Sequence, residues 1–284
     1  MLAPDWSDYK ILGSGDGLKL ELWKDIMLLR PDPQAIWRAT VDYKKFDCHA
    51  RYERDRTGGG RWIINKPMPD EWTVGWRDMS FIVKPMGFKH TGLFPEQAVN
   101  WDRLGGLTEQ ATSSGKQVKI LNLFAYTGAS TAALGKRGAF VTHVDAAKGM
   151  VERAGQNCRL NNVPQGNTRF IIDDCKKFVM REIKRGKTYN AVIMDPPSYG
   201  RGAGGEVWKM EDDIFDLVAL TAKVLDDPLF FLINSYTTGL QPQTISNILT
   251  LNLPRGKVDG YEVCLPTETK SVALPCGCSG LWTK

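Results

Sequence analysis

The sequence predicts an α/β protein with a doubly wound, Rossmann-like sheet, preceded by a small N-terminal domain that is β-rich or α+β. Two observations lead to this fold class. Beyond residue 88, apolar segments of strand length alternate with helical segments, which is typical of a parallel sheet covered by helices. Before that point, short strand-like segments are separated by turn signals. We therefore expect two domains, residues 1–88 and residues 89–284.

The N-terminal domain is predicted from four short strand-like segments. They are LKLELW (18–23), DIMLLR (25–30), RWIINK (61–66) and SFIVKPM (80–86). The connecting stretches GSGDG, RPDP, TGGG and KPMPDEW are rich in Gly, Pro and Asp, which favour turns and interrupt regular structure. This pattern favours a small β-rich or α+β unit.

The C-terminal domain is predicted from five strand-like segments with helical segments between them. The strands are expected at 118–126, 140–147, 168–174, 190–198 and 228–236. The helices are expected at 94–111, 128–138, 148–162, 175–186 and 212–225. Sheets of this kind bind ligands at the carboxyl ends of their strands, so we expect the functional residues there.

The composition narrows the class of protein. The chain has 284 residues and a formal net charge of +5, which is mildly basic and compatible with a polyanionic partner. No apolar run approaches the roughly 20 residues that a membrane helix needs. The N-terminus, MLAPDWSDYK, has neither a signal-peptide core nor an Arg-rich transit pattern. We expect a cytoplasmic protein that does not contact a membrane.

The cysteines and histidines do not predict a metal site. The six cysteines form no C-x-x-C pair, which favours free thiols in a reducing compartment. The three histidines, His49, His90 and His143, do not lie at the spacing of metal ligands, so we expect no metal.

The turn after the first strand of the C-terminal domain reads NLFAYTGAS (122–130). A pyrophosphate cofactor at this turn requires the pattern G-x-G-x-x-G, because its glycines let the backbone approach the phosphates. Here Gly128 is the only glycine, and Phe124, Tyr126 and Thr127 stand in the way of a pyrophosphate. The turn therefore favours an adenosyl ligand without phosphates over NAD or FAD.

An acidic residue stands at the tip of each of the next three strands, at Asp145, Asp174 and Asp195. A carboxylate at Asp145, 17 residues after Gly128, can accept hydrogen bonds from both ribose hydroxyls. Asp174 can accept from the adenine amino group. Each acid alone also has a structural interpretation, because polar residues occur where strands reach the surface. Three in succession favour a ligand site.

These segments resemble the class I S-adenosylmethionine (SAM) dependent methyltransferases. The resemblance is carried by NLFAYTGAS, HVDAAKGMVERAGQNCRLNN, DDCKKF and DPPSYGRG, in this order. Within that class the chain is similar, over about residues 80–240, to the bacterial large-subunit rRNA methyltransferases of the cytosine-5 and guanine-7 type. The resemblance implies a seven-stranded methyltransferase sheet, SAM as cofactor and an rRNA-like substrate.

The same family carries a K-T-G-[FY]-[FY]-x-D-Q-R-like motif that helps to hold SAM. This chain reads HTGLFPEQA (90–98), which departs from the motif at His90, Glu96 and Ala98. The resemblance and the acidic strand tips together predict these cofactor-binding residues: Thr91, Gly92, Phe94, Gln97, Phe124, Ala125, Tyr126, Thr127, Gly128, Asp145, Asp174 and Asp195.

The fourth strand ends in VIMDPPSYGRG (192–202), in which two prolines follow Asp195. Two prolines can simply stop a strand. They also fix φ and lack N–H groups, so we expect the carbonyls of Asp195 and Pro196 to point outward and to form a rigid group of acceptors that faces the methyl donor. Tyr199 would lie against the face of a flipped nucleobase. The predicted catalytic residues are Asp195, Pro196, Pro197 and Tyr199.

The cysteines bear on which atom is methylated. Methylation of cytosine C5 needs a nucleophile on C6. In the cytosine-5 branch of the family a cysteine follows the fifth strand, where this chain has Tyr236 and Thr237. Cys276 and Cys278 could replace it if the last strand reaches the site; the alternative is that they are small residues in a tight strand. We favour methylation of a nitrogen, which needs alignment and acceptors but no covalent catalyst.

Two segments combine cations with aromatic residues, 42–62 and 198–209. Such residues neutralise phosphates and stack on unpaired bases, so RNA is the expected partner. The first segment also holds four acids and could be a solvated face, and the Gly-rich second could be a mobile lid. Two other functions remain open: a SAM-binding module that binds RNA or assists assembly without catalysis, and a methyltransferase for small molecules or proteins.

Overall fold

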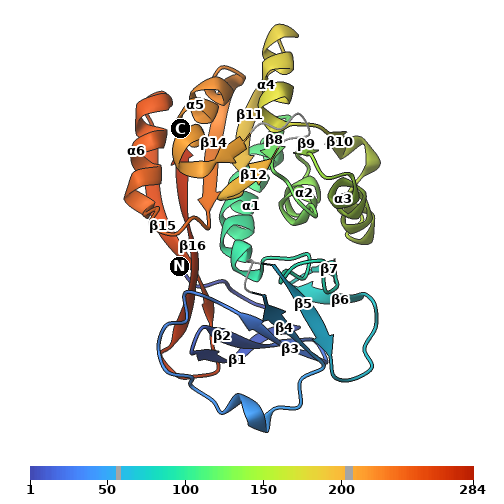
Figure 1. Ribbon diagram of the computed structural model, residues 1–284. Helices are drawn as coiled ribbons and strands as arrows, with labels where there is room; N and C mark the ends of the chain where they lie inside the picture. Colours follow the sequence, from blue (N-terminus) through green and yellow to red (C-terminus); the bar gives the residue numbers. More distant parts are fainter. Residues whose placement is uncertain (56–58, 202–206) are drawn as a thin grey trace. The chain divides into compact units, whose positions relative to one another are not determined.

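The computed structural model describes residues 1–55, 59–201 and 207–284, which form two compact units (Figure 1). The first unit comprises Met1–Val99 and Val263–Cys276, and the second comprises Asn100–Glu262 and Gly277–Lys284. The boundary expected at residues 88 and 89 therefore falls inside the first unit, which also takes in a C-terminal segment.

The segment 263–276 belongs to the first unit because its backbone pairs with the N-terminal strands. The N–H of Ala3 donates to the carbonyl of Cys264 at 2.9 Å, and the N–H of Glu268 donates to the carbonyl of Ile11 at 2.9 Å. Such long-range pairing leaves no local signal in the sequence.

The first unit is built on a five-stranded sheet in the order β1-β2-β3-β4-β5. Neighbouring strands are antiparallel, except that β3 and β4 are parallel. A separate hairpin pairs β6 with β7. The predicted N-terminal β-rich unit is thus confirmed, with three strands (β1, β4 and β6) that the sequence analysis did not identify. The bounds are β1 (Tyr9–Gly15), β2 (Leu18–Trp23), β3 (Ile26–Pro31), β4 (Ala50–Arg54), β5 (Gly60–Ile64), β6 (Trp72–Trp76) and β7 (Met79–Val83).

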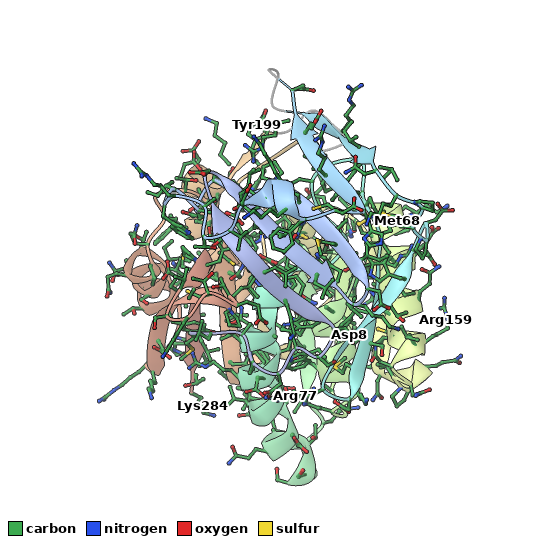
Figure 2. All side chains as sticks on the ribbon, turned by 90° about the horizontal axis from the view of Figure 1, so that it is seen from below. Asp8, Met68, Arg77, Arg159, Tyr199 and Lys284 are labelled. Carbon is green, nitrogen blue, oxygen red and sulfur yellow. The ribbon has the colours of Figure 1, made fainter. Side chains whose placement is uncertain are left out.

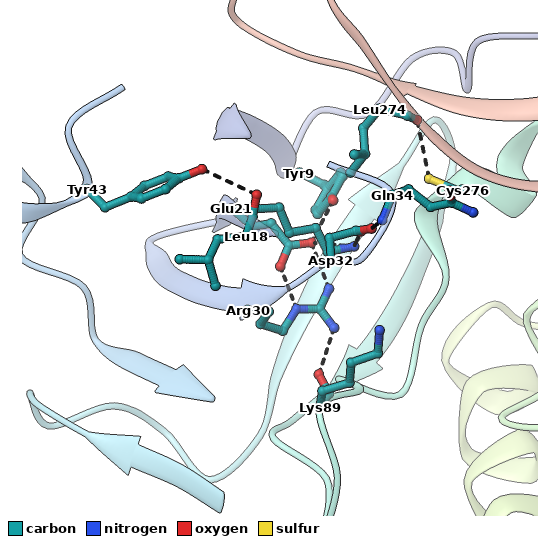
Figure 3. A network of polar contacts seen from close by, with 11 residues as sticks. Tyr9, Leu18, Glu21, Arg30, Asp32, Gln34, Tyr43, Lys89, Leu274 and Cys276 are labelled. Atoms are coloured by element: carbon teal, nitrogen blue, oxygen red, sulfur yellow. Dashed lines mark hydrogen bonds and ion pairs between the residues drawn. The ribbon is translucent and has the colours of Figure 1, made fainter. Parts of the chain in front are cut away.

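A buried cluster of charges holds β1, β2 and β3 together (Figure 3). The carboxylate of Glu21 accepts two hydrogen bonds from the guanidinium of Arg30, at 2.5 and 2.7 Å, and one from the hydroxyl of Tyr9 at 2.7 Å. The ammonium of Lys19 lies 3.6 Å from Glu21 and 3.2 Å from Asp32. Burial alone would raise the pKa of Glu21, but the charges of Arg30 and Lys19 outweigh it and lower that pKa to about 2.

The second unit is built on a seven-stranded sheet in the order β10-β9-β8-β11-β14-β16-β15, of which the end of β15 and the start of β16 are assigned to the first unit. The five strands β8, β9, β10, β11 and β14 form one parallel group, in which every pair of neighbours is parallel. The next strand, β16, runs antiparallel to β14. This confirms the predicted doubly wound, seven-stranded sheet. The bounds are β8 (Lys119–Leu123), β9 (Phe140–Asp145), β10 (Thr168–Ile172), β11 (Tyr189–Met194), β14 (Leu225–Ser235), β15 (Lys257–Pro266) and β16 (Ala273–Thr283).

Helices cover both faces of this sheet (Figure 1). On one face, Phe178, Ile214 and Leu249 of α4, α5 and α6 share a core with alternate residues of the central strands. On the other face, Thr131 of α2 is hydrogen-bonded to Asn122 of β8 at 3.0 Å. The bounds are α1 (Ala98–Ser113), α2 (Ala129–Gly135), α3 (Lys148–Leu160), α4 (Cys175–Lys184), α5 (Met210–Ala222) and α6 (Pro242–Asn252). Among the described residues, no helix combines the length and the hydropathy needed to cross a membrane.

The order of the strands reverses between β8 and β11. The chain continues from β8 to β9 and β10 on one side, and then crosses to β11 and β14 on the other side. Such a reversal leaves a crevice at the carboxyl ends of the two central strands. The ends of the two strands lie side by side there: the N–H of Asp195, directly after β11, donates to the carbonyl of Leu123, the last residue of β8, at 3.4 Å.

Replacing Glu21 by Gln is expected to lower the free energy of unfolding by about 3–5 kcal/mol, because the change leaves the buried charge of Arg30 without its counter-charge. Urea denaturation would measure the change. The control Lys10→Ala removes the exposed ion pair with Glu268 and should cost less than about 1 kcal/mol.

The same cluster predicts a pH dependence. Because the pKa of Glu21 is lowered from 4.5 to about 2 by folding, its contribution to stability is present above pH 4.5 and is lost as the pH falls towards 2. This acid-sensitive part of the stability should be missing from Glu21→Gln. Equal stability of Glu21→Gln and Lys10→Ala would contradict the assigned ion cluster.

Candidate active site

The turn after β8 has a strained backbone. Phe124, Tyr126 and Gly128 have φ angles of 54°, 50° and 79°, in the left-handed region that residues other than glycine seldom adopt. A Cβ atom on Gly128 would lie 2.5 Å from the Cβ of Ala154 and 2.9 Å from its Cα, so no other residue fits there. Strain of this kind is concentrated at ligand sites. Gly128 is therefore required both by its positive φ and by the close packing of the turn against Ala154 of α3.

Asp145, at the end of β9, holds this turn in place. Its Oδ2 accepts from the N–H of Tyr126 at 2.9 Å, and its Oδ1 accepts from the N–H of Ala147 at 2.9 Å. Burial raises the pKa of Asp145. Each carboxylate oxygen has a second lone pair, so the side chain can also accept from ribose hydroxyls. That contact stays a prediction.

The end of β10 shows that a second predicted acid has a structural role. Asp174 is the N-cap of α4, and its Oδ1 accepts from the N–H of Lys177 at 2.8 Å. Its side chain is exposed, as a contact with adenine requires, but the contact itself stays a prediction. The next residue, Cys175, was not predicted to contribute. Its sulfur accepts from the N–H of Phe124 at 3.3 Å and so supports the turn after β8.

The four residues matched in HTGLFPEQA lie in the first unit. Thr91 and Gln97 are buried, Gly92 has a φ of 88°, and the ring of Phe94 lies 5.1 Å from that of His90. The hydroxyl of Thr91 is buried and has no hydrogen-bond partner among the described residues. A buried orphan of this kind can be satisfied by a ligand. The role of these residues in binding SAM stays a prediction.

Asp195 follows β11 directly. Its Oδ1 accepts a hydrogen bond of 2.9 Å from the side-chain amide of Asn234, near the end of β14. Of the two prolines, Pro196 is buried and Pro197 is exposed. The carbonyl of Pro197 accepts from the indole N–H of Trp208 at 2.7 Å, so this carbonyl already has a donor from within the protein.

A short hairpin of β12 (Tyr199–Arg201) and β13 (Val207–Lys209) follows the prolines. Trp208 of this hairpin lies 5.4 Å from the ring of Phe124, which brings the hairpin to the turn after β8. Tyr199 is 52% exposed, and Figure 2 marks its position. The possible lid at 198–209 includes residues 202–206, which lie outside the described part of the chain.

The two C-terminal cysteines differ in their surroundings. Cys278 is paired in register with Ser235, so the last strand does reach the carboxyl end of β14. Its sulfur is buried and lies 3.2 Å from the carbonyl of Leu240, and burial raises its pKa to about 11. Cys276 belongs to the first unit, and burial raises its pKa well above the usual value. Both thiols are poor sources of a thiolate at neutral pH.

Two exposed ion pairs involve residues of the cationic segment 42–62, one within the segment and one with Lys66, which lies just beyond it. Arg51 lies 2.8 Å from Glu53, and Asp47 lies 2.6 Å from Lys66. This pairing fits the solvated-face interpretation for these residues. Residues 56–58 lie outside the described part of the chain. In the ranges that the structure covers, no group of three or more His, Cys, Asp or Glu side chains is arranged to hold a metal ion.

The family is decided by comparison with known proteins. The family model described as S-adenosylmethionine-dependent methyltransferase matches residues 31–212, which is more than half of the chain. The chain belongs to this family. Its cofactor is SAM, and the residues after β8 fit it: the turn has a single glycine, and Phe124, Tyr126 and Gly128 all have positive φ angles.

Individual relatives agree with this assignment. A crystal structure of the SAM-dependent methyltransferase from Agrobacterium tumefaciens is 30% identical and has a TM-score of 0.92, covering 99% of this chain and 92% of that one. The ribosomal RNA large subunit methyltransferase K/L of Allochromatium vinosum is 30% identical over 62% of this chain. The methyltransferase K of Neisseria meningitidis serogroup B is 23% identical over 75% of it. The chain spans 24% and 59% of the length of these two relatives.

Asn234 and Trp208 are the functional candidates that the sequence analysis missed. Asn234 is a polar residue that follows the apolar run of β14, near the end of that strand. A polar residue at the end of an apolar strand is the same signal from which the three acids were predicted. Trp208 lies in the segment noted for its aromatic residues, but its contact with Phe124 joins parts of the chain that are far apart in sequence.

Replacing Gly128 by Ala is expected to weaken SAM binding at least about tenfold, because the new Cβ would be strained and would overlap Ala154. Isothermal titration calorimetry would measure the change. Gly149→Ala is the matched control, since a Cβ at Gly149 meets no atom within 4 Å. Comparable SAM affinity in both variants would show that the turn does not contact SAM.

Replacing Asp145 by Ala should weaken SAM binding by a few kcal/mol, because charge-assisted hydrogen bonds to the ribose would be lost. The ionised carboxylate is the acceptor, so wild-type affinity should fall as the pH drops through the pKa of Asp145. Since burial raises that pKa above 3.8, the loss should begin at a higher pH than for an ordinary aspartate. The affinity of Asp145→Asn should lack this pH dependence, and unchanged affinity in Asp145→Ala would remove the residue from the site.

Proposed function

We propose that the protein transfers the methyl group of SAM to a nitrogen atom of a nucleobase in RNA, with an rRNA-like substrate and a cytoplasmic location. The observation that carries the proposal is the position of Asp195. It lies at the strand reversal, beside the turn after β8, and its carboxylate is held by the amide of Asn234.

The reaction requires two contributions from the protein: alignment of the nucleophile with the methyl group of SAM, and a proton acceptor. SAM supplies an electrophilic methyl group on its sulfonium. A nitrogen nucleophile that carries hydrogen must lose a proton when it gains the methyl group, and the second lone pairs of the Asp195 carboxylate can accept either a hydrogen bond from that nitrogen or the proton itself. A carboxylate fixed before the substrate arrives needs no reorganisation during transfer.

The aromatic side chains after Asp195 suit the flat face of a base. Tyr199 is half-exposed, and Trp208 packs against Phe124 of the cofactor turn. An aromatic ring stacks on any base, so it contributes affinity without choosing the sequence. The names of the rRNA methyltransferase relatives support RNA as the substrate.

The same proposal assigns the remaining predicted roles. Asp195, Pro196, Pro197 and Tyr199 would form the catalytic loop. The cofactor would be contacted by Thr91, Gly92, Phe94, Gln97, Phe124, Ala125, Tyr126, Thr127, Gly128, Asp145, Asp174 and Asp195.

The two other functions are separated by one experiment. SAM with a tritiated methyl group would be incubated with the protein and with total RNA, protein and small-molecule fractions of a bacterial lysate. Label in RNA, released as a methylated nucleoside, supports the proposal. Label in another fraction would replace the substrate class, and SAM binding without transfer to any fraction would favour a non-catalytic SAM-binding module.

Replacing Asp195 by Ala should lower turnover roughly 100-fold or more, the usual scale for a positioned acid–base or electrostatic group, while SAM affinity changes much less. Initial rates with labelled SAM and RNA would measure turnover, and calorimetry would measure binding. Full activity of Asp195→Ala would show that the Asp-Pro-Pro sequence only terminates the strand.

The cysteine variants are the controls for the choice of nitrogen. Cys276→Ser and Cys278→Ser should leave turnover nearly intact, because no covalent adduct is proposed. A covalent complex with RNA containing 5-fluorocytosine that is lost in either variant would revive cytosine-5 chemistry with a relocated thiol.

A further inference from the structure

A buried chain of hydrogen bonds runs through the second unit to Asp195. The hydroxyl of Tyr261 donates to Oδ1 of Asn100 at 2.6 Å, and Nδ2 of Asn100 donates to the hydroxyl of Ser279 at 3.0 Å. Ser279 donates to Oδ1 of Asn234 at 2.8 Å, and Nδ2 of Asn234 donates to Oδ1 of Asp195 at 2.9 Å. The four donors come from β15, α1, β16 and β14, so no single element could supply the chain.

The charge of Asp195 sets the direction of every bond in this chain. An ionised carboxylate only accepts hydrogen bonds, so Asn234 must turn its NH₂ group towards Asp195 and its oxygen away from it. That oxygen then requires a donor, which is the hydroxyl of Ser279. The proton of the Ser279 hydroxyl is engaged in that bond, so the hydroxyl oxygen accepts a hydrogen bond from the NH₂ group of Asn100. The amide oxygen of Asn100 in turn accepts a hydrogen bond from the hydroxyl of Tyr261.

Packing alone does not account for these residues. Asn100, Asn234 and Ser279 are at most 1% exposed, and burying polar groups is costly unless each is hydrogen-bonded. The four residues of β14 before Asn234, 230–233, are buried and apolar. Asn234 and Ser279 are direct partners across β14 and β16. Apolar side chains at this pair would pack the sheet, whereas here the hydroxyl of Ser279 donates to the amide of Asn234 and that amide donates to the carboxylate of Asp195.

We propose that this chain is a positioning network, in which Asn234 and Ser279 hold the Asp195 carboxylate in one orientation for methyl transfer; the catalytic part rests on the proposed function. Asn234 acts on Asp195 directly, Ser279 fixes the amide of Asn234, and Tyr261 and Asn100 fix the hydroxyl of Ser279. The influence of each residue should therefore decrease with the number of bonds between it and Asp195.

The kinetic test uses single substitutions along the chain, with labelled SAM and the RNA fraction that accepts label. Ser279→Ala should lower kcat by about tenfold, Asn234→Ala by more and Tyr261→Phe by less, with KM for SAM unchanged within about twofold, because misplacement of a reacting group affects the rate more than binding. The control is Thr221→Val, which removes a buried hydroxyl on α5 that has no hydrogen-bond partner among the described residues. It should leave kcat unchanged.

A double-mutant cycle separates positioning from general destabilisation. If Ser279 acts through Asp195, adding Ser279→Ala to Asp195→Ala should cause no further loss of residual activity. A loss that multiplies in the double variant, or one that Thr221→Val reproduces, would overturn the proposal. Thermal unfolding of each variant would show whether it is folded at the assay temperature.

A second measurement does not depend on catalysis. With ¹⁵N-labelled asparagine, the side-chain amide signal of Asn234 can be identified by its loss in Asn234→Ala. Ser279→Ala and Asp195→Ala should each shift this signal, and Thr221→Val should not. If the wild-type protein methylates no fraction, the proposed function and the catalytic part of this inference fail together. The shifts of the amide signal would then still support the hydrogen-bond network that orients the Asp195 carboxylate. A signal unchanged in both variants would overturn the network itself.

Discussion

The pairing of β8 with β11 is the constraint on which the candidate site depends. These strands are separated in the sequence by three α-helices and two strands, yet they are parallel neighbours with Leu123 beside Met194. After β8 the chain continues to β9 on one side of this pair, and after β11 it continues to β14 on the other side. The segments that follow the two strands therefore diverge and leave a crevice between them. That is why the strained turn and Asp195 meet at one edge, and why Asp145 and Asn234, at the ends of the flanking strands β9 and β14, can reach them.

The sequence predicted the parts of the molecule that are encoded locally. The alternation of strands and helices, the single glycine of the cofactor turn and the acids at the strand tips are each visible within a few residues of one another. The assignment of 263–276 to the first unit was not visible, because it arises from pairing between the two ends of the chain. For the same reason the sequence could name Asp195 but not its partner Asn234, since their contact requires the register of β14 against β11.

The acids also show why residue type and position do not fix a role. Asp145 and Asp174 both follow strands of the same sheet, but Asp145 ties two turns together, whereas Asp174 caps a helix. Cys278 likewise reaches the edge where a catalytic thiol would be needed, and yet its surroundings raise its pKa to about 11. The environment of each side chain, rather than its place in a motif, decides which chemistry it can support.

The division of β16 between the two units has a consequence for synthesis. The first unit requires residues 263–276, and the ribosome makes these after nearly all of the second unit. The N-terminal strands must therefore wait, with their partner missing, while more than half of the chain emerges. The last strand, β16, begins in this segment and continues into Ser279, which is paired with Asn234. A chain that stops before residue 263 would therefore lack both the backbone partners of Ala3 and Ile11 in the first unit and the hydroxyl that donates to Asn234 in the second.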